Sequence, residues 1–151
     1  MIYSKYRDTQ EQNLNNGYYE NLDENFIQAL NFFEQNYSHE EIIDLLKTGN
    51  IPQKQIAALK LDTIKSVEDA QVLVSNLTGQ DGKIREAVSL RLVEFMSDPE
   101  LLKYFQTPQN YKIFLDAIID INGNICRNII SALENLKNNN NFCEIFTQKL
   151  T

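Results

Sequence analysis

The sequence predicts an all-α fold: a right-handed α–α superhelix of about eight helices, stacked in pairs. Three observations lead to this prediction. The 151 residues include only five Gly and three Pro, too few turn residues for a many-stranded sandwich or barrel. From about residue 23 onward, apolar residues recur at helical spacing behind readable helix starts. Three stretches also align with one another without gaps, which is typical of a helical repeat.

Residues 1–22 differ from the rest of the chain. They are polar, rich in Asn and Gln, and their four tyrosines, Tyr3, Tyr6, Tyr18 and Tyr19, lack helical spacing. We interpret them as a polar N-terminal arm, either flexible or loosely docked on the body. Residues 23–151 are then the helical-repeat domain.

The first helices have clear starts. Asp23 is a candidate N-cap for a helix whose apolar stripe runs over residues 26–37. Ser38-His39-Glu40-Glu41 is a capping box, in which the Ser hydroxyl and the Glu41 carboxylate satisfy free amides. Gly49 is expected to end this second helix in the left-handed conformation.

The later helices have similar start and stop signals. Pro52 suits the first turn of the third helix, Ser66-Val67-Glu68-Asp69 starts the fourth, and Gly79 ends it. Nothing is predicted as a strand; residues 118–121 are the one β-like patch, and they continue a helical stripe. Further helices are expected to open at Asp98-Pro99, at Thr107-Pro108, at Gly123 and after the Asn run at 138–141.

The repeat consists of residues 50–64, 81–95 and 122–136, which begin 31 and 41 residues apart. Their matching apolar positions have the i, i+4, i+7 spacing of one helix face. These positions are Ala57, Val88 and Ile129; then Leu61, Leu92 and Leu133; then Ile64, Phe95 and Leu136.

The stretch Asp81-Gly82-Lys83-Ile84-Arg85-Glu86-Ala87-Val88 resembles the second-helix signature of the HEAT repeat. In that family the Asp and the Arg tie adjacent repeats together. The first copy has Asn50 and Lys54 at these places, and the third has Asn122 with its arginine displaced to Arg127. The resemblance covers about residues 38–137 and implies a HEAT-like α-solenoid.

The alternative fold is a generic helical bundle around one closed core. The middle copy favours stacking, because Leu90 and Val93 lie nearly opposite its core stripe. A helix that is apolar nearly all round is expected to be sandwiched between neighbours.

Composition and chemistry exclude several functions. The net charge of −7 disfavours nucleic acid and anionic membranes, and no apolar run approaches the ~20 residues of a bilayer span. With no secretory leader visible, a cytoplasmic location is expected. The only histidine, His39, is expected to decorate the first turn of a helix, and Cys126 and Cys143 suit neither a metal site nor an activated thiol. We therefore predict no enzyme activity, no cofactor and no metal.

The second helices of successive pairs line the concave face of HEAT-like proteins, so the resemblance implies a partner site there. Extended faces of this kind bind proteins or peptides, and we predict a protein-binding adaptor. Positions on the far side from the core stripe would form the contact surface, in which acidic residues predominate: Gln55, Asp62, Glu86, Val93, Arg127 and Glu134.

Two other functions stay open. The chain also resembles HEAT-like subunits of bilin lyases, which would require a pocket for a tetrapyrrole. A purely structural role in a larger assembly is the other. The apolar residues of the last helix, Phe142, Ile145 and Phe146, also leave room for self-association through the C-terminal end.

Overall fold

The computed structural model describes residues 24–150, and within them every regular element is a helix. The predicted arm and the candidate cap Asp23 lie outside the described residues. The all-α prediction is confirmed for residues 24–150. None of the helices there is long and apolar enough to cross a bilayer.

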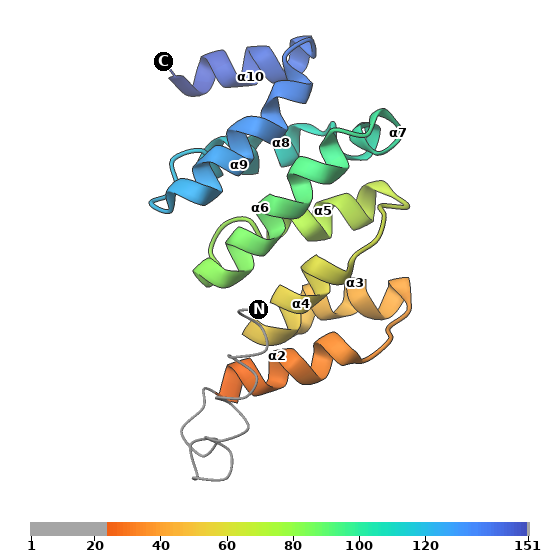
Figure 1. Cartoon of the computed structure of the whole chain (residues 1–151). Helices are drawn as coiled ribbons and strands as arrows, with labels where there is room; N and C mark the ends of the chain where they lie inside the picture. The colour runs from red at the N-terminus through yellow and green to blue at the C-terminus, as the bar shows by residue number, and fades with distance from the viewer. Residues whose placement is uncertain (1–23, 151) are drawn as a thin grey trace, which may run out of the picture.

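The long helices form two rows, and each helix packs on the next member of its own row (Figure 1). One row consists of α2 (Glu24–Glu34), α4 (Ile51–Lys60), α6 (Gly82–Met96) and α9 (Gly123–Leu133). The other consists of α3 (His39–Thr48), α5 (Val67–Ser75), α8 (Pro108–Ala117) and α10 (Asn140–Leu150). Three short elements complete the described chain: α7 (Pro99–Leu102) and the 3-10 turns η2 (Lys103–Phe105) and η3 (Glu134–Leu136).

Most helices begin where the local sequence predicts. The capping box at Ser38 and Glu41 is complete, and the Ser66 hydroxyl accepts the Asp69 N–H at 3.1 Å. Asp98 caps a helix as predicted, but that helix has only four residues before it tightens into η2. These caps explain why the helix starts could be found without knowledge of the packing.

The prediction for Gly49 is wrong. Its φ of −69° is ordinary extended backbone, whereas Gly79 is the glycine that adopts a left-handed φ of +71°. Gly49 is instead required for close approach, because a Cβ there would lie 2.5 Å from the Leu45 carbonyl oxygen.

The nine matched positions of the repeat all face the core. Each is at least nine-tenths buried, as the shared i, i+4, i+7 face predicts. The three copies form α4, α6 and α9 together with the residues that follow each helix, so the repeat maps onto three consecutive members of one row.

One position of the repeat carries a polar side chain that contacts the loop ahead of the next helix in the same row. Lys54 on α4 donates to the side-chain oxygen of Asn76 at 2.9 Å, in the loop ahead of α6. Arg85, the equivalent residue on α6, reaches the loop ahead of α9, where its Nε and Nη2 lie 2.8 and 3.1 Å from the two Asp120 oxygens. The third copy has Cys126 at this position, and its thiol donates to the Asp120 carbonyl.

The Arg85–Asp120 pair is well shielded, since only 8% of the Asp120 side chain is exposed. The hydrogen bonds from Arg85 hold the pKa of the Asp120 carboxyl below its ordinary value, against the opposing effect of burial. Arg85 thus ties α6 to the loop that precedes α9. The Asp81 carboxylate instead caps its own helix by accepting the Lys83 N–H at 2.9 Å.

Candidate partner-binding face

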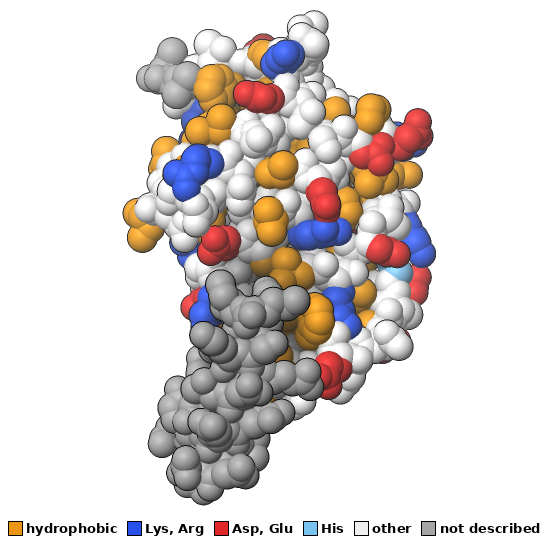
Figure 2. All heavy atoms as spheres, in the orientation of Figure 1, with side chains coloured by type: hydrophobic (Ala, Val, Ile, Leu, Met, Phe, Trp, Pro, Cys, Tyr) orange, Lys and Arg blue, Asp and Glu red, His pale blue; other side chains and the backbone are white. Residues whose placement is uncertain are grey.

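Four large apolar side chains are exposed on consecutive helices of the first row. They come from α2, α4 and α6, and we call them the apolar stripe: Leu30 (45% exposed), Phe33 (59%), Leu59 (40%) and Leu90 (53%). Figure 2 shows hydrophobic side chains gathered along the middle of this face, over α4 and α6. In the opposite row the exposed large hydrophobic residue is Val67, among the residues described.

The stripe follows from the repeat itself. Leu59 and Leu90 occupy equivalent places in the first two copies, two residues before the buried Leu61 and Leu92. Two residues correspond to about 200° around a helix, so each exposed leucine lies opposite a core leucine. Because α4 packs on α6, the two exposed leucines lie on neighbouring helices.

Two cations beside the stripe are already held by the protein. The Lys60 ammonium lies 5.5 Å from the centre of the Phe33 ring, and it also donates to the backbone carbonyl of Gln35. The Arg91 guanidinium carbon lies 4.7 Å from the centre of the Phe95 ring, and its Nη2 donates to the Leu61 carbonyl. Both side chains are therefore fixed against the surface rather than extended from it.

The carboxylates of this face protrude further into solvent. Asp62, in the loop after α4, has 82% of its side chain exposed. Glu94, one turn beyond Leu90, has 68% exposed and pairs with Arg91. Leu90 and Glu94 thus lie one turn apart on α6, whereas Asp62 follows the end of α4.

The structure brings together only some of the six residues predicted for partner binding. Asn124 joins two of them, because its amide donates to Glu86 at 3.3 Å while its oxygen accepts from Arg127. Asp62 turns toward the other row, where its carboxylate lies 3.9 Å from His39 Nδ1. The remaining three are separate from these contacts: Gln55 and Val93 are half-buried, and Glu134 is exposed at the start of η3.

Sequence reasoning missed the apolar stripe. Leu59 and Leu90 stand four residues after the predicted Gln55 and Glu86, so helical spacing already placed them on the same face. Leu90 was instead expected between neighbouring helices, and its 53% exposure shows that this expectation was wrong. Periodicity identifies an apolar side of a helix but does not say what covers it.

The end of the first row has its own apolar surface. A cavity of about 220 Å³ lies between α9 and α10, and Ile130 on its rim is half exposed. Ile130 occupies the place that the fully buried Ala58 has on α4 and that the fully buried Ser89 has on α6. The cavity is lined by Ile118, Ile130, Leu133, Glu134, Phe142 and Phe146.

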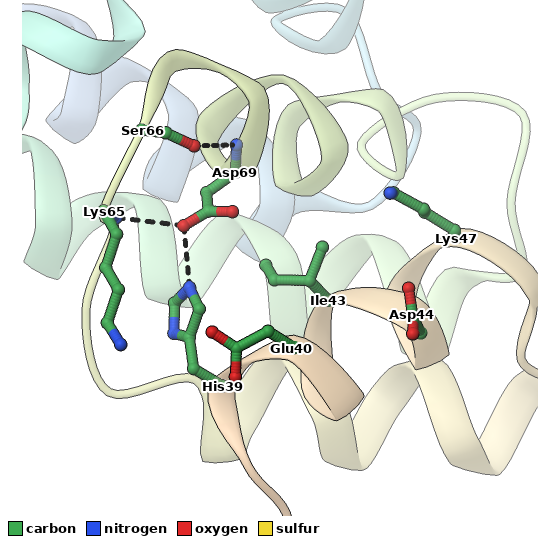
Figure 3. Close-up of a pocket in the computed structure, with 8 residues that line it drawn as sticks. All are labelled: His39, Glu40, Ile43, Asp44, Lys47, Lys65, Ser66 and Asp69. Atoms are coloured by element: carbon green, nitrogen blue, oxygen red, sulfur yellow. Dashed lines mark hydrogen bonds and ion pairs between the residues drawn. The ribbon is translucent and has the colours of Figure 1, made fainter.

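A polar pocket of about 330 Å³ lies between the starts of α3 and α5 (Figure 3). His39 lies in the first turn of α3, as predicted, and its Nε2 points at the Asp69 carboxylate, 2.7 Å away. Asp69 also accepts the Lys65 N–H at 3.0 Å, so it holds the histidine and the preceding loop together.

The histidine in this pocket is arranged to join two helices. A carboxylate only accepts hydrogen bonds, so Nε2 donates its proton to Asp69. Nδ1 is buried and has no hydrogen-bond partner among the described residues. Within residues 24–150, moreover, no three His, Cys, Asp or Glu side chains gather where a metal ion could be held.

Comparisons with protein-family models, with curated proteins and with solved structures gave no match.

Proposed function

We propose that this chain is a short HEAT-like α-solenoid, a right-handed superhelix that binds another protein without catalysing a reaction. The apolar stripe on α2, α4 and α6 is the observation that carries the proposal. Two further features support the solenoid: the rows of successively packed helices, and the ties from Lys54 and Arg85 to the next helix pair. In a solenoid, each repeat contacts mainly its neighbours, which leaves one face of a row open for a partner.

The chemistry of the face indicates the kind of partner. Leu59 and Leu90 offer apolar area at the centre, and the exposed carboxylates of Asp62 and Glu94 stand beside them. Lys60 lies against the Phe33 ring, and Arg91 offsets the charge of Glu94 through their ion pair. Asp62, whose side chain is 82% exposed, is therefore the carboxylate that would meet a cation of the partner. A segment with apolar residues flanked by Lys or Arg would complement both features.

We expect such a segment to bind through Leu90. The test uses two fluorescent peptides with identical apolar residues, one with Lys and one with Glu at the flanking positions. Anisotropy should show binding of the Lys peptide, weakening with salt, and weak binding of the Glu peptide. Leu90→Asp should reduce affinity for the Lys peptide about tenfold or more, because a charge at the centre of the contact must be desolvated.

The matched control is Ile121→Asp. Ile121 is 99% exposed in the loop before α9, so it presents the same chemical change away from the stripe. Both variants should keep the wild-type melting temperature in circular dichroism, since neither residue is buried. Equal binding by Leu90→Asp and wild type, or equal loss in both variants, would remove the stripe as the binding site.

A further inference from the structure

We propose that two copies of this chain associate through the end of the first row, with α9 of one copy lying antiparallel to α9 of the other. This surface does not include the apolar stripe, so the inference goes beyond the proposed function. Three features of α9 support it: the direction of its exposed apolar side, the cavity beside it, and two charges that have no counter-ion among the described residues.

Ile130 lies on the side of α9 that faces away from α6, and α9 is the last described helix of the first row (Figure 1). Asn128 marks the opposite side, because its amide donates to Ser89 on α6 at 3.1 Å. Two residues correspond to about 200° around a helix, so Ile130 lies nearly opposite Asn128. Ser89 has the equivalent place on α6 and is fully buried, whereas Ile130 is 50% exposed. The position that α6 uses to contact the next helix of the row is therefore left uncovered on α9 by residues 24–150.

The surface around Ile130 combines a protruding apolar side chain with a hollow. The cavity between α9 and α10 has a volume of about 220 Å³, and Ile130 stands on its rim, opposite Phe142 and Phe146 of α10. A cavity of about 150 Å³ can hold a benzene molecule, so this one can hold the isoleucine side chain of a second copy. A symmetric dimer requires a surface that complements itself, and a protruding side chain beside a hollow meets this requirement.

The charges on either side of Ile130 are also self-complementary. Arg127 precedes it by three residues and Glu134 follows it by four, about one helical turn in each direction. When two such helices run antiparallel about a two-fold axis near Ile130, Arg127 of each copy meets Glu134 of the other. Within residues 24–150 neither side chain forms an ion pair. Arg127 donates to the neutral Asn124 oxygen and keeps further N–H donors for a carboxylate.

The concentration dependence of the molecular mass tests the association. One side of α9 and the rim of one cavity form a small interface, so we expect a weak dimer with a Kd of roughly 10–100 µM. In sedimentation equilibrium of the full-length chain at physiological ionic strength, the average mass should rise from 17.5 kDa toward twice that value between about 5 and 500 µM. A mass that stays at 17.5 kDa over this range would overturn the proposal.

Ile130→Asp should weaken the dimer about tenfold or more, because the two-fold axis places the new charge in the contact twice. The matched control is Leu90→Asp, since Leu90 is 53% exposed and belongs to the apolar stripe. This control should leave the dimer unchanged. Equal weakening by both substitutions would show either association through the stripe or a general effect of charge, and both results contradict the proposal.

Charge reversal tests the antiparallel arrangement itself. Arg127→Glu and Glu134→Arg should each weaken the homodimer roughly fivefold, because each brings like charges together at two symmetric contacts. An equimolar mixture of the two variants should regain wild-type association, since opposite charges then face each other at both contacts of the mixed dimer. Both residues are exposed, so these variants should fold even if Ile130→Asp does not. Association of the mixture no tighter than that of either variant alone would overturn the proposal.

Discussion

Replacing Asp120 with Asn should lower the free energy of unfolding by about 3 kcal/mol, measured by urea unfolding at pH 7. The Asp120 carboxylate faces both Nε and Nη2 of Arg85 and also accepts the Asn122 N–H at 2.9 Å. The Asn side chain keeps an oxygen for the backbone contact but leaves the Arg85 charge without its counter-ion in a shielded place. The large effect follows because a half-removed buried pair is worse than no pair.

The same carboxylate should make stability depend on pH. The pKa of Asp120 is lower in the folded protein than in the unfolded chain, so ionisation favours folding. This contribution is complete above the ordinary carboxyl pKa of about 3.9 and disappears as the pH falls through the lower folded value. The difference in unfolding free energy between wild type and Asp120→Asn should therefore shrink in acid.

Asp116→Asn is the control for this pair. Asp116 pairs with Lys149, and both side chains are more than half exposed, so the same substitution should change stability by less than about 0.5 kcal/mol. A loss at Asp120 as small as the loss at Asp116 would show that the Arg85 tie does not stabilise the stacking of α6 on α9.

Ser89→Ile should also destabilise the protein by about 3 kcal/mol in thermal or urea unfolding. Ser89 is fully buried where α6 packs on α9, and its hydroxyl accepts from the Asn128 amide at 3.1 Å. A branched side chain would force the helices apart and leave the Asn128 amide without this partner. Both effects act on the same contact, so the change should exceed that of either alone.

Two further variants separate the effect of added side-chain volume at Ser89 from the effect of the lost hydrogen bond. Ser89→Ala removes the hydroxyl without adding volume and should cost about 1 kcal/mol. Ile130→Ser makes the reverse exchange at the open flank of α9, where Ile130 is half exposed, and should also cost about 1 kcal/mol. If Ser89→Ile and Ser89→Ala were equally stable, packing at this crossing would not limit the approach of α9.

The helix starts could be predicted because caps are local. Ser38, Ser66 and Thr107 each accept a hydrogen bond from the backbone N–H three residues ahead. Both partners of such a contact lie within four consecutive residues, so the sequence alone shows them. Burial of the repeat face could be predicted for a similar reason, since i, i+4, i+7 spacing defines a side of a helix. The backbone conformation of Gly49 could not be predicted, because a glycine in an extended conformation and one in a left-handed conformation look the same in the sequence.

The tertiary contacts could not be predicted in the same way. Arg85 was identified through the family resemblance, but its counter-ion Asp120 lies 35 residues away, inside the patch that reads as β-like. The sequence placed the predicted partner contacts along α4, α6 and α9, and the exposed leucines of α4 and α6 were missed because coverage depends on where neighbouring helices stop. The position of His39 in the first turn of a helix was predicted, but its partner Asp69 was not, because the two are 30 residues apart.

The packing of each helix on near neighbours in the chain has a consequence for synthesis. α2 and α3 both pack on α4, so these three helices have partners before the chain has been translated beyond residue 60. A nascent chain can therefore begin to bury its apolar residues before α9 and α10 have been translated. This shortens the time during which apolar surface is exposed to other nascent chains.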